Sequence, residues 1–239
     1  DHMDVRAVVC LPTYNERENL EAIVRALGEE KLSVLVIDDN SPDGTGELAD
    51  RLAEELDYLE VLHRETKEGL GPAYLAGFRQ ALSNGADLIL EMDADFSHNP
   101  HDVHRLIHWA NEADVVLGSR YVQGGSIRNW GRWRRFVSSA GSKYARRVLG
   151  VRVHDLTGGF KCYRREVLEE LDLNAISSRG YAFQIETTYR ALRAGFRVVE
   201  VPIAFVDRQQ GGSKMSRGIV LEAIWKVPAL RLQALTRRL

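Results

Sequence analysis

The sequence of 239 residues has few cysteines and no long apolar run. The two cysteines, Cys10 and Cys162, form neither the paired pattern of a disulfide-rich secreted domain nor the clustered spacing of a zinc site, so we expect two buried thiols. No stretch reaches the roughly 18–20 apolar residues that cross a bilayer. The N-terminal residues also lack the basic and then apolar pattern of a signal peptide. These absences favour a cytoplasmic globular protein.

Two common phosphate-binding motifs are also missing. No G-x-G-x-x-G follows the first apolar run, which disfavours a dinucleotide-dependent dehydrogenase, and no G-x-x-x-x-G-K-[ST] is present, which disfavours a P-loop NTPase. A sugar-1-phosphate nucleotidyltransferase is expected to carry a glycine-rich loop near the first strand, and none is found there.

The net charge of −2 hides an uneven distribution along the chain. Residues 1–114 hold 25 acidic and 9 basic residues, whereas residues 115–154 hold 9 basic residues and no acid. Residues 155–239 are basic again, with 14 bases against 9 acids. Such separation predicts a site that handles both cations and anions. Nothing in the composition favours a nucleic-acid partner.

Short apolar runs alternate with amphipathic stretches through the first half of the chain, which predicts an α/β fold with a mostly parallel sheet flanked by helices. We expect residues 1–3 to be a cloning remnant, residues 4–217 to form one catalytic domain and residues 218–239 a C-terminal amphipathic helix interrupted by Pro228. A mobile loop is expected over residues 121–131, and a single strand over residues 197–205. The remaining predicted strands are 5–11, 33–37, 59–63, 87–92, 115–118 and 160–163, and the helices are 16–29, 44–56, 71–83, 101–111, 136–149, 165–171 and 182–194.

Polar residues gather where the predicted parallel strands end, which is where open parallel sheets bind ligands. Asp93-Ala94-Asp95 follows one apolar strand, and two carboxylates at this spacing can hold one Mg²⁺ or Mn²⁺ ion. A capped acidic turn is the alternative. Asp38-Asp39 follows another strand and either caps a turn or accepts hydrogen bonds from a ribose or base.

Two basic segments allow two interpretations each. The acid-free segment 115–154 is either a solvated helix face or a surface for phosphate or anionic lipid. In the second segment, Arg208 and Lys214 flank Gly211-Gly212. This is either a surface loop or a loop that closes over a diphosphate. Gln184 and Glu186 lie on a predicted helix, where a buried carboxylate requires a cationic partner.

Several motifs, taken in order, resemble glycosyltransferase family 2 with its GT-A fold, and in particular the dolichyl- or polyprenyl-phosphate mannose synthases. The resemblance covers about residues 5–217. It rests on the strand-end motifs Pro12-Thr13-Tyr14-Asn15-Glu16, Asp38-Asp39 and Asp93-Ala94-Asp95, and then on residues 118–121, 155–160, 180–186 and 205–214.

The resemblance implies transfer of mannose from GDP-mannose to a polyprenyl phosphate, with Mg²⁺ or Mn²⁺ as cofactor. It implies that the metal lies on Asp93 and Asp95, with Ser97 standing where some family members have a glutamine ligand. The catalytic set implied is Asp93, Asp95, Arg120, Arg134, Arg208 and Lys214, of which the last two bind donor phosphates. The donor nucleotide would contact Pro12, Thr13, Tyr14, Glu16, Asp38, Asp39, Asp93, Ala94 and Asp95, and the acceptor phosphate would contact Arg120, Arg134, Arg135 and Ser138.

The acceptor phosphate is already a good nucleophile near pH 7, so the chemistry needs cations rather than a strong base. In-line attack predicts inversion to a β-linked product. We expect GDP-mannose, the lipid phosphate and a membrane surface as partners, with a separate membrane-anchoring protein as a further candidate. The expected location is the inner face of the cell membrane. The C-terminal helix either lies on that membrane or packs on the core. The alternatives are a UDP-glucose or UDP-N-acetylglucosamine donor, or a non-catalytic protein that binds nucleotide sugars.

Overall fold

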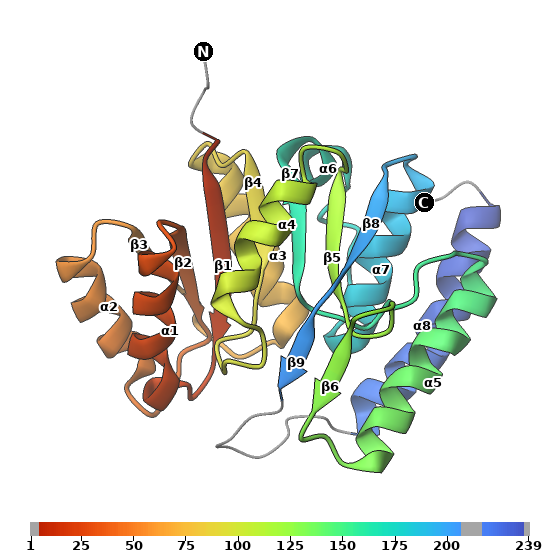
Figure 1. Cartoon of the computed structure of the whole chain (residues 1–239), viewed down its shortest axis with the longest axis horizontal. Coiled ribbons are helices and arrows are strands. Elements are labelled where there is room, and N and C mark those ends of the chain that lie inside the picture. Colours follow the sequence, from red (N-terminus) through yellow and green to blue (C-terminus); the bar gives the residue numbers. More distant parts are fainter. Residues whose placement is uncertain (1–4, 207–216, 237–239) are drawn as a thin grey trace.

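Seven strands form the central sheet of the computed structural model, which describes residues 5–206 and 217–236 (Figure 1). The strand order is β3-β2-β1-β4-β7-β5-β8. All neighbouring strands pair in parallel except β7, which is antiparallel to β4 and β5. The mostly parallel sheet confirms the predicted fold class. The strands are β1 (Ala7–Thr13), β2 (Ser33–Asp38), β3 (Leu59–His63), β4 (Leu88–Glu91), β5 (Val115–Ser119), β7 (Lys161–Arg164) and β8 (Val198–Pro202).

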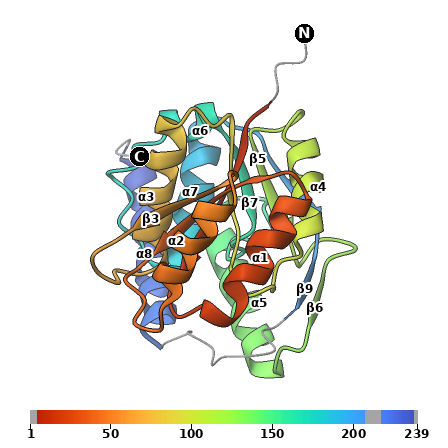
Figure 2. The same cartoon turned by 90° about the vertical axis from the view of Figure 1, so that its left-hand side faces the viewer.

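Helices cover both faces of this sheet, as Figure 2 shows edge-on. One face carries α1 (Arg17–Glu29), α2 (Thr45–Glu55) and α4 (Val103–Trp109). A single 3₁₀ turn over Pro100–Asp102 precedes α4. The opposite layer contains α3 (Leu70–Ser83), α5 (Arg132–Leu149), α6 (Arg165–Glu170), α7 (Gly180–Arg193) and α8 (Arg217–Leu235). Helix α5 begins four residues earlier than the sequence pattern predicts.

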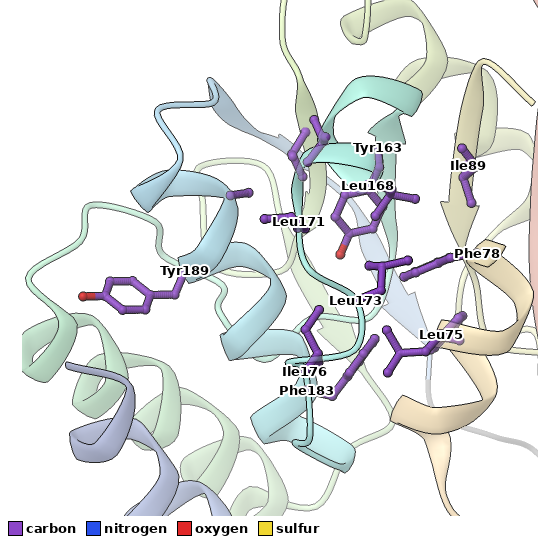
Figure 3. Packing of buried hydrophobic residues seen from close by; sticks show 14 of the residues in the cluster. Leu75, Phe78, Ile89, Tyr163, Leu168, Leu171, Leu173, Ile176, Phe183 and Tyr189 are labelled. Carbon is purple, nitrogen blue, oxygen red and sulfur yellow. The ribbon is translucent and has the colours of Figure 1, made fainter. Parts of the chain in front are cut away.

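Strand β1 divides its side chains between two hydrophobic cores because successive residues of a strand face opposite sides of the sheet. Val9 and Leu11 pack beneath α1 and α4, whereas Val8 and Cys10 pack beneath α3. Figure 3 shows residues of the second core, among them Phe78 of α3 and Phe183 of α7. Both of these rings stack on Tyr74, with ring centroids 5.9 and 6.0 Å apart. Cys10 and Cys162 are both buried free thiols, which confirms the expectation from the sequence.

The segment predicted as one strand over residues 197–205 forms two strands, so that prediction is wrong. β8 pairs with β5 as far as the Ser119–Pro202 pair, and the chain then leaves the sheet. The next residues form β9 (Ala204–Val206), which pairs in parallel with β6 (Ser126–Arg128). The predicted loop over residues 121–131 therefore contains a strand. A separate two-stranded ribbon extends beyond the carboxyl end of β5 (Figure 1).

Helix α8 continues through Pro228, although the sequence predicts an interruption there. Proline lacks the N–H group that would bond to the carbonyl oxygen four residues earlier. Here the Tyr144 hydroxyl of α5 donates to that oxygen, on Ile224, at 2.9 Å. The neighbouring helix therefore supplies the hydrogen bond that Pro228 cannot make.

Candidate functional site

A cavity of about 500 Å³ lies beyond the carboxyl ends of the parallel strands. This size is typical of small-molecule sites, and the position is the one expected for open α/β sheets. Ten of the predicted site residues line the cavity: Pro12, Thr13, Tyr14, Glu16, Asp39, Asp93, Ala94, Asp95, Arg120 and Arg134. Segments far apart in the sequence thus meet at one site.

One end of the cavity is formed by the loops after β1, β2 and β3. The ammonium group of Lys67 lies 3.8 Å from the centre of the Tyr14 ring, a cation–π contact. Asp39 Oδ1 accepts a hydrogen bond from Arg64 at 2.7 Å. Burial raises the pKa of Asp39, and the Arg64 guanidinium opposes that effect. An aromatic ring beside hydrogen-bonding and charged groups is suited to a nucleoside.

Asp38 has a structural role at the same strand end. Its side chain is buried and accepts hydrogen bonds from the Thr13 hydroxyl at 2.9 Å and from the Ser41 amide at 3.0 Å and hydroxyl at 2.6 Å. These bonds fix the two loops relative to each other. Asp38 is not among the residues that line the cavity.

The acidic triplet Asp93-Ala94-Asp95 follows β4 and forms part of a tight turn. Asp95 accepts hydrogen bonds from the amide, at 3.0 Å, and the hydroxyl of Ser97. Between them, Phe96 has a positive φ of 60°, which a bulky residue adopts only where its surroundings hold it. The Ser97 hydroxyl thus orients Asp95.

Two carboxylates on one cavity wall suit a hard divalent cation, which prefers oxygen ligands. No cluster of three His, Cys, Asp or Glu side chains suited to a metal occurs in residues 5–206 and 217–236. This donor set fits an ion that takes the rest of its ligands from substrate phosphates and water, as Mg²⁺ and Mn²⁺ commonly do. Asp93 and Asp95 are the residues that would hold it.

His98 forms a hydrogen bond with the backbone of the acidic turn. Its Nδ1 accepts a hydrogen bond from the Asp93 amide at 3.2 Å, which requires the neutral ring. The ring stacks on Phe160 with centroids 4.8 Å apart and meets Phe205 edge-on at 5.3 Å. Burial lowers the pKa of His98 to about 4, so the ring stays neutral near pH 7. His98 therefore joins the acidic turn to β9.

At the other end of the cavity, Arg120 forms a buried bidentate pair with Asp155. Arg120 Nε and Nη2 donate to the two Asp155 oxygens at 2.8 and 2.7 Å, and Arg120 Nη2 also donates to Thr157 at 3.0 Å. Burial opposes the charge on the guanidinium, but the Asp155 carboxylate outweighs it and raises the pKa of Arg120. The cation is thereby fixed in one orientation.

Trp130 brings a second arginine to the same end. The guanidinium carbons of Arg134 and Arg120 lie 4.5 and 5.3 Å from its ring centres. Its indole N–H is buried and has no hydrogen-bond partner in the described part of the chain. Arg120, Arg134 and this N–H together suit a phosphate group.

Two predicted phosphate contacts lie elsewhere. Arg135 is exposed and donates to the Ile127 carbonyl at 2.7 Å, and it does not line the cavity. Ser138 is buried and accepts from the Tyr121 hydroxyl at 2.8 Å. It also lies within 3.3 Å of the Thr157 hydroxyl, behind Arg120. Arg208 and Lys214 lie outside the described residues.

Several cavity residues were not singled out as site residues from the sequence. Lys67, His98, Trp130, Arg179 and Glu222 all line the cavity. Trp130 lies in the acid-free basic segment 115–154, and the remaining four belong to no motif that the sequence pattern marks. Glu186, in contrast, has the cationic partner that the sequence predicts, because Arg190 Nε donates to it at 2.9 Å.

The fold and site together define an α/β protein in which acidic groups and cations face one cavity beyond the carboxyl ends of the parallel strands. Residues 8–172 match the model of the family "Glycosyl transferase family 2", and the chain belongs to this family. It is therefore a glycosyltransferase, as the resemblance predicts.

Two curated relatives are similar over most of their length. A polyprenol monophosphomannose synthase of Mycolicibacterium smegmatis is 52% identical over 227 residues, which cover 93% of this chain and 85% of the relative. An undecaprenyl-phosphate mannosyltransferase of Micrococcus luteus is 49% identical over 232 residues, covering 96% of each chain.

Two solved structures share the fold at low sequence identity. A mannosyltransferase from Pyrobaculum calidifontis, solved with GDP-Man and Mn²⁺, has a TM-score of 0.57 and 18% identity over 97% of this chain and 74% of its own. GalNAc-T7, solved with UDP, GalNAc and Mn²⁺, has a TM-score of 0.60 and 16% identity over 99% of this chain and 48% of its own.

Proposed function

We propose that the protein transfers mannose from GDP-mannose to a polyprenyl phosphate. The observation that carries the proposal is one cavity lined by Tyr14, Asp39 and the acidic pair and also by Arg120 and Arg134. The strand order β2-β1-β4-β7-β5 separates the loops after β1 and β2 from the loop after β5 that holds Arg120. Two phosphorylated substrates need such an arrangement. The names of the two relatives that are 52% and 49% identical to this chain support mannose and a polyprenyl phosphate as the transferred sugar and the acceptor.

At the donor end, the guanosine would lie against Tyr14 and Asp39, with Pro12, Thr13 and Glu16 around it. Asp93 and Asp95 would hold Mg²⁺ or Mn²⁺ on the diphosphate. When bound, the metal neutralises charge that develops on the departing GDP. Arg208 and Lys214 are proposed to contact the donor phosphates from residues 207–216.

At the acceptor end, Arg120 and Arg134 would bind the lipid phosphate and overcome its repulsion from the anionic donor. One phosphate oxygen attacks the anomeric carbon as the bond to GDP breaks, so the α-linked mannose becomes β-linked. The attacking oxygen is already ionised, so no protein group needs to remove a proton from it.

A membrane surface is the proposed source of the acceptor. Helices α5 and α8 lie side by side near the cavity, to which they contribute Arg134, Gly218 and Glu222 (Figure 1). Helix α5 contains no acidic residue and has exposed Arg132, Arg135, Lys143 and Arg147. Exposed apolar residues accompany these cations on both helices, namely Trp133, Phe136, Leu221, Ile224, Trp225, Leu232 and Leu235.

This combination of cations and exposed aromatic side chains suits an anionic bilayer. No described helix is long and apolar enough to cross one. We propose that the two helices rest on the inner face of the cell membrane, so that the isoprenoid chain stays in lipid while its phosphate enters the cavity. Helix α8 also packs on the core through Val227, Leu230 and Ala234, so the two roles expected of it are compatible.

Membrane binding is tested by flotation with vesicles of phosphatidylcholine alone or with anionic phosphatidylglycerol. The wild type should float with the anionic vesicles, and the double substitution Trp133→Ser and Trp225→Ser should reduce the bound fraction severalfold. Trp109, an exposed tryptophan on α4, provides the matched control Trp109→Ser, which should bind as the wild type does. Equal flotation of all three proteins would refute the assigned surface.

Catalysis is tested by incubating the protein with radiolabelled GDP-mannose, Mn²⁺ and undecaprenyl phosphate, followed by solvent extraction. Label in the lipid phase, with a β linkage by NMR, is expected. A preference for UDP-glucose or UDP-N-acetylglucosamine would overturn the donor assignment. Binding of GDP-mannose without turnover would indicate a non-catalytic protein.

A further inference from the structure

The side-chain amide of Gln184 is buried at the cavity without a hydrogen bond of ordinary geometry in the described part of the chain. Gln184 lies on α7 and is 2% exposed, yet it is one of the residues that line the cavity. Neither its oxygen nor its nitrogen makes a hydrogen bond of ordinary geometry in residues 5–206 and 217–236. Burying an amide in this way is unfavourable unless a ligand satisfies it.

Gly159 lies beside the amide and places no side chain against it. This glycine lines the same cavity, and a Cβ atom at position 159 would lie 3.3 Å from Gln184 Nε2. Any larger side chain at position 159 would therefore crowd the amide. The glycine belongs to the segment at residues 155–160, on which the family resemblance partly rests.

The backbone carbonyl of Gln184 is fixed by a buried lysine. Lys161 Nζ donates to its carbonyl oxygen at 3.0 Å and to the Thr187 hydroxyl at 2.9 Å. The buried carboxylate of Glu91 lies nearby and accepts from the Tyr163 hydroxyl at 2.8 Å. Burial raises the pKa of Glu91, while Lys161, Tyr163 and the Gln184 amide oppose the rise, although no hydrogen bond of ordinary geometry joins the amide to Glu91.

The chemistry of the amide differs from that of its surroundings. The acidic pair suits a metal and the arginines suit phosphate, whereas an amide is uncharged and offers both donors and acceptor sites. The hydroxyl groups of a hexose also donate and accept, so one amide can pair with two neighbouring hydroxyls. The hexose is the uncharged part of the donor and must lie between the diphosphate and the acceptor phosphate.

We propose that Gln184 binds hydroxyl groups of the donor hexose and is a specificity-determining residue of the transfer. This inference rests on the proposed function and assigns the sugar subsite within it. Because the amide stays neutral, the subsite binds the sugar without adding charge to the reaction centre.

The test compares Gln184→Met, which keeps the side-chain size but removes the hydrogen-bonding groups, with a control on the same helix. Thr188→Val is that control, because the Thr188 hydroxyl is also buried without a partner but does not line the cavity. For Gln184→Met we expect kcat/KM for GDP-mannose to fall about tenfold or more, the effect of losing a hydrogen bond to a buried polar group. The Kd of GDP, which lacks the sugar, should change less than twofold, and Thr188→Val should change neither.

A second test uses GDP-mannose analogues that each lack one hydroxyl group of the mannose. The wild type should lose about tenfold in kcat/KM with the donor that lacks the contacted hydroxyl, and Gln184→Met should show no such loss. A merely structural role in supporting Glu91 would weaken GDP and GDP-mannose equally, and that result would overturn the inference. So would an unchanged Gln184→Met variant. Failure of the wild type to transfer mannose would instead overturn the proposed function, and the inference with it.

Discussion

The buried pair of Arg120 and Asp155 makes a quantitative prediction about folding and acceptor binding. The two side chains are 4% and 0% exposed, and Asp155 accepts three hydrogen bonds from Arg120, one of them from the backbone amide at 2.9 Å. In Asp155→Asn the shape is kept, but the charge and one acceptor oxygen are lost. Removing one partner of such a pair typically lowers the free energy of unfolding by about 3–5 kcal/mol.

Because asparagine retains one acceptor oxygen, we expect a loss near the lower end, about 3 kcal/mol. For a chain of this size, that corresponds to a fall of roughly 6–12 °C in Tm, measured by calorimetry. The control Glu169→Gln removes the exposed pair with Arg165 and should lower Tm by only about 2 °C or less. The KM for the lipid phosphate should also rise in Asp155→Asn, because Arg120 loses its fixed orientation. A Tm within 2 °C of the wild type would refute the assigned role of this pair.

Three further predictions concern stability and accessibility. The pKa of His98 is about 4 in the folded protein and about 6.5 in the unfolded chain, so the unfolded chain binds more protons between these pH values. The free energy of unfolding of the wild type, measured by urea unfolding in EDTA, should therefore fall by roughly 3 kcal/mol as the pH is lowered through this window. A similar loss in His98→Phe would contradict the assignment. Burial raises the pKa of Cys162 to about 12 and raises that of Cys10 as well. Neither thiol should therefore react with a disulfide reagent at pH 8 until the protein unfolds. Rapid labelling of the native protein would contradict this burial. In Gly125→Ala the new Cβ would lie 2.7–2.8 Å from backbone atoms of Ser119 and Arg120. We therefore expect a lower Tm and a higher KM for the lipid phosphate. Wild-type values for both would show that this loop adjusts freely.

The sequence predicted the parallel half of the sheet because buried parallel strands are continuous apolar runs, as β2 is. It did not predict that β7 is antiparallel to both of its neighbours, since a strand of four residues carries no signal of direction. Nor could a local pattern predict that the chain changes sheets after Pro202, because β9 pairs with β6, which is distant in sequence.

Apart from Asp38, the donor-site residues predicted at the strand ends line the cavity, because the parallel topology fixes where the strands end. The pairing of Arg120 with Asp155 and the placement of Trp130 depend on the tertiary fold, which the sequence pattern does not encode locally. For the same reason Asp38 and Arg135, which look equivalent to their neighbours Asp39 and Arg134 in the sequence, point to other partners.

The central claim is that one cavity brings a nucleotide-bound mannose to a lipid phosphate, and the most direct measurement compares two kinetic constants in one variant. In Arg134→Gln, assayed with radiolabelled GDP-mannose and undecaprenyl phosphate, the KM for the lipid phosphate should rise about tenfold or more. The Kd of GDP should stay within twofold of the wild-type value. A variant in which GDP binding weakens while the KM for the lipid phosphate is unchanged would contradict the division of the cavity into a donor end and an acceptor end.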